Sequence, residues 1–274
     1  MVKIFLDTAD IKEIKEAIKT GILDGVTTNP SLIKKAIEKY KNENPGLELE
    51  QYIKDILIIC KGKPVSLEVI GHSFDDMIKE GVVLFKKFNK VAENVYVKIP
   101  INPCLETQCS NSSDGIKAIK YLSSHKIPVN CTLIFTPEQA LLAAKAGAIF
   151  ISPFIGRVDD YIREINKIKF KKEDYFPQEG LKIGRKILND NGIVSGINLL
   201  KEIVEIFGKY KIKSKVLAAS IRNNRQFRES ALAGADIITI PFSVYKKLLI
   251  HEKTLEGMKK FTEDVVEEYK RLLK

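Results

Sequence analysis

The stretch Val95-Tyr96-Val97-Lys98-Ile99-Pro100 has the pattern of a buried β-strand that carries a single lysine. β-branched and aromatic residues fill it, and Asn94 and the final proline bound it. Because side chains alternate across a strand, Tyr96 and Lys98 lie on one face and the three β-branched residues on the other. If both faces are buried, burial disfavours the charged ammonium, and a neutral amine can attack a carbonyl to form a Schiff base. A lysine at a strand end with its amine in solvent is the alternative.

This run is one of eight short apolar runs that alternate with longer amphipathic patterns. The runs are Val2–Leu6, Gly25–Thr28, Val65–Val69, Val95–Ile99, Val129–Leu133, Ile149–Ser152, Val216–Ala219 and Ile237–Ile240. Helices are predicted between them, among others at Ile11–Lys19, Phe74–Phe88, Gly115–Leu122, Pro137–Ala146, Ile197–Phe207 and Arg225–Ala233. Eight strand–helix units over about 250 residues are typical of an α/β fold of the (β/α)8 TIM-barrel type. A doubly wound open sheet would instead carry a Gly-rich phosphate loop after the first strand, where Asp7-Thr8-Ala9-Asp10 stands.

Several segments exceed a compact barrel. Tyr40–Gly46 is predicted as a polar loop before a helix at Leu47–Cys60. Asn102–Asp114 and Arg163–Asn191 are predicted insertions on the active-site face because both follow strand ends, and we expect extra helix as well as loop in the second. The tail Thr254–Lys274 is predicted as a final amphipathic helix, either packed on the barrel or forming an arm to a neighbouring subunit.

The composition is that of an ordinary globular protein. The 274 residues include 45% hydrophobic and 29% charged residues. We expect a single domain over residues 1–274, because no stretch rich in Pro, Gly or Ser divides the chain. No apolar run reaches the roughly 18 residues of a membrane span. The apolar stretch at the start of the sequence is too short for a signal peptide, because the acidic Asp7 follows it at once. We therefore expect a cytoplasmic protein with no membrane partner.

The net charge of +10 suits an anionic partner. Lysines such as Lys12, Lys15 and Lys19 are scattered along helical patterns, and no zinc-finger or RNA-binding signature occurs. We therefore predict no nucleic-acid partner. A small phosphorylated ligand needs only two or three of these cations.

Four cysteines occur, at Cys60, Cys104, Cys109 and Cys131. In a reducing compartment we expect free thiols, although Cys104 and Cys109 lie close together in a polar loop and could pair under oxidation. None of the three histidines stands beside that loop, and zinc spacing usually needs a second ligand pair. We predict no metal site.

Polar residues recur at the carboxyl ends of the predicted strands, where TIM barrels carry their chemistry. Singly, each has a plain explanation as a helix cap, a satisfied core residue or a surface ion pair. Together they are Asp7, Asn29, Glu68, Lys98, Asn130, Thr132, Ser152, Arg157, Ser220 and Arg222. They suit an imine formed on the lysine, with a carboxylate as base. The asparagines and Ser152 would orient sugar hydroxyls, and the arginines with Ser220 would hold a phosphate.

With these motifs in order, the sequence closely resembles the transaldolase family, in its short subfamily that also contains fructose-6-phosphate aldolases. The matching pieces are Phe5-Leu6-Asp7-Thr8-Ala9, Gly25-Val26-Thr27-Thr28-Asn29-Pro30-Ser31, Val65-Ser66-Leu67-Glu68-Val69, Val97-Lys98-Ile99-Pro100, Asn130-Cys131-Thr132-Leu133, Ser152-Pro153-Phe154-Ile155-Gly156-Arg157 and Ala218-Ala219-Ser220-Ile221-Arg222. The resemblance implies transfer of a dihydroxyacetone unit from fructose 6-phosphate or sedoheptulose 7-phosphate to erythrose 4-phosphate or glyceraldehyde 3-phosphate. That reaction belongs to the non-oxidative pentose phosphate pathway and needs no cofactor.

The resemblance also implies a role for each matched residue. Lys98 would form the Schiff base, Asp7 would act on the C4 hydroxyl of the donor, and Glu68 and Thr132 would hold a proton-relaying water. The substrate-binding residues would be Thr27, Asn29, Asn130, Ser152, Phe154, Arg157, Ser220 and Arg222. Short members form pentamers that pair into decamers through an exchanged C-terminal helix, so a homo-oligomer is expected.

Two positions favour transfer over free aldol cleavage. The related aldolases carry Gln where Glu68 stands and Tyr where Phe154 stands. A tyrosine hydroxyl would help water to hydrolyse or protonate the three-carbon imine, and phenylalanine cannot. A fructose-6-phosphate aldolase is the alternative within the family. A deoxyribose-phosphate type of Schiff-base aldolase and a non-catalytic binder of sugar phosphate or nucleic acid are the alternatives outside it.

Overall fold

The computed structural model describes residues 1–43, 46, 48–107 and 109–273. Eight parallel strands form a closed barrel in the order β1-β10-β9-β6-β5-β4-β3-β2. Their bounds are β1 (Lys3–Asp7), β2 (Gly25–Thr27), β3 (Val65–Glu68), β4 (Val95–Pro100), β5 (Val129–Ile134), β6 (Phe150–Pro153), β9 (Lys215–Ala218) and β10 (Ile237–Ile240). Each strand coincides with one of the eight apolar runs, so the prediction of a TIM barrel is confirmed.

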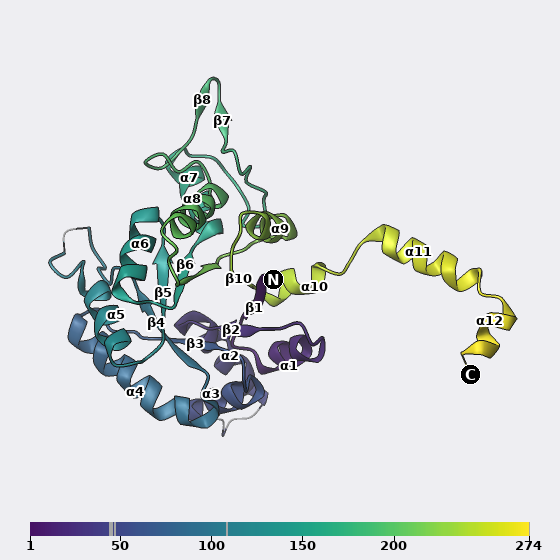
Figure 1. Cartoon of the computed structure of the whole chain (residues 1–274), viewed down its shortest axis with the longest axis horizontal. Helices are drawn as coiled ribbons and strands as arrows, with labels where there is room; N and C mark the ends of the chain where they lie inside the picture. Colours follow the sequence, from purple (N-terminus) through teal and green to yellow (C-terminus); the bar gives the residue numbers. More distant parts are fainter. Residues whose placement is uncertain (44–45, 47, 108, 274) are drawn as a thin grey trace.

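Helices surround this barrel (Figure 1). Their bounds are α1 (Ile11–Lys19), α2 (Pro30–Glu43), α3 (Leu49–Ile59), α4 (Phe74–Ala92), α5 (Asp114–Ser124), α6 (Pro137–Ala146), α7 (Ile155–Ile165), α8 (Gly196–Lys209), α9 (Asn224–Leu232) and α10 (Phe242–Lys247). Side-chain caps mark several starts, since Asp10, Thr136 and Ser195 each accept a hydrogen bond from the first helical turn that follows.

The barrel interior has an apolar layer and, nearer the carboxyl ends of the strands, a polar layer. The apolar layer is a cluster that includes Phe5, Phe150 and Ile237, with the Tyr96 ring stacked 4.6 Å from that of Phe150. Gly25 leaves the space that the Phe5 ring fills, because a Cβ there would lie 2.5 Å from its Cζ.

On each of these strands, a polar residue stands two positions after the apolar one. Because alternate residues of a strand share one face, these polar side chains also point into the barrel. Asp7, Lys98, Ser152 and Thr239 stand in these positions. The interior therefore places its polar layer at the carboxyl ends of the strands.

The predicted loop at 40–46 begins too early. Helix α2 continues through Tyr40 to Glu43, and residues 44, 45 and 47 lie outside the described part. The Tyr40 hydroxyl donates to Asp10 Oδ1 at 2.7 Å, and its ring lies 5.5 Å from that of Tyr52. These contacts hold the last helical turn against α1 and α3, which the polar sequence did not reveal.

The segment 163–191 contains no helix beyond the end of α7, so the expected extra helix there is wrong. It forms turns and a two-stranded hairpin, β7 (Lys182–Ile183) with β8 (Lys186–Ile187), which projects from the body (Figure 1). Gly184 takes a φ of 60° in the turn between them, which a glycine permits at no steric cost.

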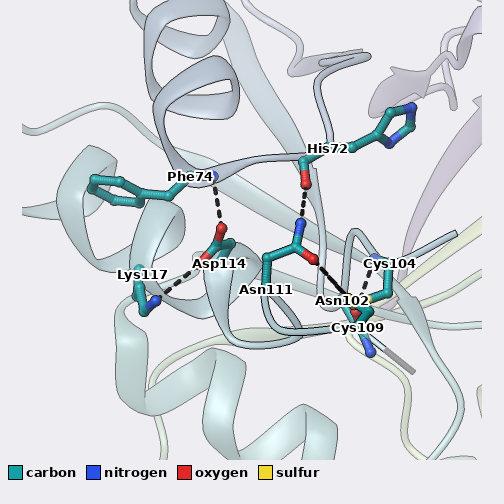
Figure 2. Close-up of a disulfide and its surroundings, with 8 residues drawn as sticks. All are labelled: His72, Phe74, Asn102, Cys104, Cys109, Asn111, Asp114 and Lys117. Atoms are coloured by element: carbon teal, nitrogen blue, oxygen red, sulfur yellow. Dashed lines mark hydrogen bonds and ion pairs between the residues drawn. A yellow bond between two sulfur atoms is a disulfide. The ribbon is translucent and has the colours of Figure 1, made fainter. Parts of the chain in front are cut away.

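Residues 111–114 lie beside the loop that follows β3. The Asn111 Nδ2 donates to the His72 carbonyl at 2.6 Å, and Asp114 accepts from the Phe74 amide at 3.0 Å (Figure 2). A disulfide joins Cys104 to Cys109, so the expectation of free thiols is wrong for this pair. It is correct for Cys60 and Cys131, which are buried.

The C-terminal tail does not pack on the barrel. It forms two helices, α11 (Glu252–Glu263) and α12 (Glu267–Leu272), that extend away from the body (Figure 1). Neither contains a buried residue. The prediction of a single helix is therefore wrong at residues 264–266, and the packed alternative is excluded. Among the described helices, none combines the length and apolarity of a membrane span.

Candidate active site

A cavity of about 840 Å³ opens at the carboxyl ends of the barrel strands. Ten of the twelve residues predicted from the sequence line it, namely Asp7, Thr27, Asn29, Lys98, Asn130, Ser152, Phe154, Arg157, Ser220 and Arg222. Glu68 and Thr132 do not. The barrel thus brings together residues that are more than 200 positions apart in the sequence.

Lys98 is buried in this polar layer, with its side chain only 7% exposed. Its Nζ lies 3.0 Å from Glu68 Oε2 and donates to the Thr28 carbonyl at 3.2 Å. Glu68, Lys98 and Asn130 are register partners on neighbouring strands, so all three side chains share the inward face. The alternative of a lysine with its amine in solvent is therefore excluded. Glu68 contacts the Lys98 ammonium but does not itself line the cavity.

Asp7 lies on the other side of the barrel, where two threonines fix it. Thr27 Oγ1 donates to Asp7 Oδ1 at 2.8 Å and lies 2.6 Å from Thr239 Oγ1. Burial raises the pKa of the Asp7 carboxyl above its usual range. The positive charge of Lys98 and the hydrogen bond from Thr27 act in the opposite direction without cancelling it. The site therefore holds one carboxyl that binds a proton more readily than an exposed one.

Asn130 is fixed at both ends of its amide. Its Nδ2 donates to Ser66 Oγ at 3.0 Å, and its Oδ1 accepts from Ser152 Oγ at 2.7 Å. Asn29 has a structural duty as well, because its Oδ1 accepts from the Leu32 amide at 2.9 Å and caps α2. Both amides line the cavity with defined orientations.

Thr132 is fully buried, and its Oγ1 has no hydrogen-bond partner among the residues the structure describes. The register of β5 against β6 shifts between Cys131 and Ile134, and Leu133 takes a φ of 59°. Such bulges occur beside active sites, where they redirect a side chain. A buried hydroxyl without a partner is costly, so Thr132 has unused capacity to bind a polar group.

The arginines gather at another part of the cavity. Arg222 Nη2 lies 2.9 Å from Asp160 Oδ2, and the guanidinium of Arg157 lies 5.2 Å from the centre of the Phe154 ring. Ser220 takes a φ of 61°, which is strained for a residue with a Cβ. Gly156 makes room for this loop, because a Cβ there would lie 2.4 Å from the Ser220 carbonyl oxygen.

Sequence reasoning missed some residues of this site. Thr239 is a polar residue within the otherwise apolar run of β10, and that interruption was a usable signal. Asp160 lies one helical turn after Arg157, which gave no indication that it would pair with Arg222. Lys172 and Tyr175 line the cavity from the insertion, and nothing local in the sequence predicts this. Among the described residues no cluster of three His, Cys, Asp or Glu could hold a metal ion.

Comparison with known proteins places these residues in a context. Residues 4–273 match the family model described as Transaldolase/Fructose-6-phosphate aldolase. A protein of Thermoplasma volcanium named probable transaldolase is 42% identical over 262 residues, covering 96% of this chain and 94% of its own length. A probable transaldolase of Leptospira biflexa is 41% identical, covering 95% of this chain and 96% of its own.

The same fold occurs in a protein of little sequence similarity. A solved structure of a Pediococcus acidilactici protein described as a lactate oxidase superposes with a TM-score of 0.50 at 12% identity. The superposition covers 90% of this chain and 64% of that protein. At this identity the likeness concerns the fold alone.

Proposed function

This chain belongs to the transaldolase/fructose-6-phosphate aldolase family, and on that premise we propose that it is a transaldolase. The enzyme would move a dihydroxyacetone unit from fructose 6-phosphate or sedoheptulose 7-phosphate to erythrose 4-phosphate or glyceraldehyde 3-phosphate. The observation that carries the proposal is the buried Lys98, whose Nζ lies 3.0 Å from Glu68 in a cavity that also holds Asp7.

Lys98 would act as the nucleophile. Its amine adds to the C2 carbonyl of the ketose phosphate, and loss of water gives an iminium ion. Glu68 and the unpartnered hydroxyl of Thr132 are suited to hold the water that carries protons to and from the adduct. The iminium then accepts the electron pair of the bond that breaks.

Asp7 would act as the base. It removes the proton of the C4 hydroxyl, the C3–C4 bond breaks, and the aldose phosphate leaves. The electron pair of the broken bond passes to the iminium and gives an enamine on Lys98. The same steps in reverse join the three-carbon unit to the acceptor aldehyde, and hydrolysis of the imine then releases the new ketose. A carboxyl with a raised pKa suits a group that must both take and return a proton.

The remaining cavity residues would bind the sugar. Asn29, Asn130 and Ser152 present amide and hydroxyl groups to the three-carbon unit. Thr27 holds the base in place. Arg157, Ser220 and Arg222 would hold the phosphate, for which the planar arginine fork is well suited.

Phe154 favours transfer over aldol cleavage. Its ring lines the cavity and lies 5.9 Å from that of Phe135. Because phenylalanine has no hydroxyl, this ring cannot donate a hydrogen bond to a water near the imine. The three-carbon unit would then stay on the lysine until an aldehyde arrives. A fructose-6-phosphate aldolase is the alternative within the family, and the relatives' names do not favour it.

The deciding experiment measures release of glyceraldehyde 3-phosphate from fructose 6-phosphate, with and without erythrose 4-phosphate. Release that depends on the acceptor would establish the transaldolase. Sustained release without an acceptor would make the enzyme an aldolase.

The role of Lys98 has its own test. We expect Lys98→Ala to lower turnover at least about thousandfold, because the nucleophile is lost, while circular dichroism shows an intact fold. Borohydride reduction in the presence of fructose 6-phosphate should add the mass of the trapped three-carbon unit to the wild-type chain and nothing to the variant. Near-normal turnover in the variant would overturn the mechanism.

The cellular setting also remains part of the proposal. We place the reaction in the non-oxidative pentose phosphate pathway, which the family resemblance implies, and in the cytoplasm. We also propose a homo-oligomer, a pentamer or decamer by family resemblance, in which the arm of α11 and α12 packs on another copy. The exposed apolar side chains of that arm, such as Leu255 and Phe261, support this assembly.

A further inference from the structure

The insertion after α7 reaches the cavity. Lys172, Glu173 and Tyr175 line it, although all three lie in the segment that exceeds a compact barrel. A second cavity of about 550 Å³ adjoins the first, and the residues that line both are Arg157, Lys172 and Arg222. A lysine from the insertion therefore lies with two arginines where the cavities meet.

A buried arginine holds the turn that carries this lysine. Arg163 Nη2 donates to the carbonyls of Asp174 and Tyr175, at 3.2 and 2.8 Å, and its guanidinium lies 4.8 Å from the centre of the Phe176 ring. The turn also closes on itself, since the Lys171 amide donates to Asp174 Oδ2 at 2.8 Å. Lys172 is thus presented by a turn with fixed backbone contacts.

The other side of the turn is attached to α9 and to its N-cap residue, Asn223. The Tyr175 hydroxyl donates to Glu229 Oε1 at 3.0 Å, and the guanidinium of Arg225 lies 3.5 Å from the centre of the Tyr175 ring. Asn223 Nδ2 donates to the Glu173 carbonyl at 3.3 Å. Asn223 directly follows Arg222, so the insertion is anchored beside the proposed phosphate-binding loop.

The three cations where the cavities meet differ in their pairing with carboxylates. Asp160 already pairs with Arg222, which reduces the positive charge that Arg222 can offer to a ligand. Within the described ranges, neither Arg157 nor Lys172 forms an ion pair with a carboxylate. A phosphate monoester carries close to two negative charges at neutral pH. Lys172 therefore supplies a positive charge that no carboxylate of the described residues pairs with, unlike that of Arg222.

We propose that Lys172 is a third cation of the phosphate subsite and binds the phosphate group of the sugar substrates. The inference rests on the proposed function and extends it. A six-carbon ketose and a seven-carbon ketose attached to the same amine carry their phosphates one carbon apart. A lysine ammonium on a flexible four-carbon stem can follow that displacement, whereas an arginine held by Asp160 cannot.

The test compares Lys172→Met with Lys171→Met. Methionine keeps much of the aliphatic stem, and Lys171 is an exposed neighbour that lines neither cavity. The measured quantity is kcat/KM for erythrose 4-phosphate and for unphosphorylated erythrose, with fructose 6-phosphate as the donor. In a ping-pong reaction this ratio does not depend on how the donor binds.

We expect Lys172→Met to lower kcat/KM for erythrose 4-phosphate about tenfold and that for erythrose less than about twofold. Lys171→Met should change neither, and Lys172→Arg should restore most of the loss. Equal losses on both acceptors, or no loss on either, would overturn the role of Lys172.

Failure of the proposed function gives a different result. If the wild-type enzyme releases glyceraldehyde 3-phosphate without an acceptor, the transfer reaction is wrong. The same comparison, made with fructose 6-phosphate against fructose, then decides the role of Lys172: a selective loss on the phosphorylated ketose supports it, and equal effects on both contradict it.

Discussion

Asp7 combines a proposed catalytic role with a cost to stability. Because its pKa is raised in the folded protein, the folded chain binds this proton more tightly than the unfolded chain. The ionised carboxylate therefore destabilises the fold at pH values above the raised pKa, and this cost disappears as the pH falls through it. Ionisation is nevertheless what the proposed base requires.

We predict that Asp7→Asn lowers kcat about thousandfold, as expected for loss of a general base, and raises the melting temperature at pH 7. The asparagine carries no charge to bury, and its carbonyl can still accept from Thr27. Melting curves recorded from neutral to acidic pH check the sign. The difference between variant and wild type should shrink toward low pH, and a less stable variant at pH 7 would contradict the argument.

In the proposed mechanism, the ring of Phe154 determines how long the intermediate persists. We predict that Phe154→Tyr raises release of glyceraldehyde 3-phosphate without an acceptor by about tenfold, because a hydroxyl would orient a water toward the imine. Steady-state assays without erythrose 4-phosphate measure it. Phe135→Tyr is the matched control, since that ring packs against Phe154 but does not line the main cavity. No gain in Phe154→Tyr would undo this explanation of the intermediate's lifetime.

Among the elements, the barrel strands were predictable and the additions were not. In a strand such as Val129–Ile134, all residues but Leu133 are buried, so its mostly apolar run carries the signal by itself. Ile183-Gly184-Arg185 has the glycine of a hairpin turn, but the basic residues around it masked the pattern. The helix of the tail is interrupted at Val265 and Val266. Both are β-branched residues of low helix propensity, and neither α11 nor α12 has a buried residue whose packing would offset it.

The loop after β4 holds the disulfide and follows the strand of Lys98. The Cys104–Cys109 bond closes a short loop, so in the chain-entropy model it stabilises the fold by about 2 kcal/mol. We predict that dithiothreitol lowers the unfolding free energy by about that amount at most. Urea titrations with and without reductant measure it.

A double variant, Cys104→Ser with Cys109→Ser, provides the control for that titration. It should match the reduced wild type and show no response to reductant, because Cys60 and Cys131 are free thiols already. A response of the double variant to dithiothreitol would mean that the effect arises elsewhere.

At the scale of the whole molecule, the arm is the part that the barrel does not need. Its apolar residues are exposed, with Phe261 at 69% and Leu272 at 80%. We predict that a chain ending at His251 keeps the circular dichroism of the folded barrel, since no residue of α11 or α12 is buried, but loses the mass of the proposed oligomer. Light scattering after gel filtration measures that mass. An unchanged mass would show that the arm is not the interface.

The cavity shows where sequence reasoning ends. Lys98, Asn130 and Ser152 could be predicted because each is a polar residue on the inward face of a barrel strand, and the barrel closes these faces into one ring. Lys172 could not, since its place depends on Arg163, a buried arginine that holds the insertion through two carbonyl oxygens. Contacts of that kind have no period in the sequence.

The floor of the cavity is bonded together without any ligand. Thr27 donates to Asp7, and Asn130 links Ser66 to Ser152. The rotamer entropy of these side chains is therefore lost once, during folding, and not again at each encounter with a sugar. Because the bonds run between strands, opening the barrel at this end and dismantling the floor are a single cooperative event.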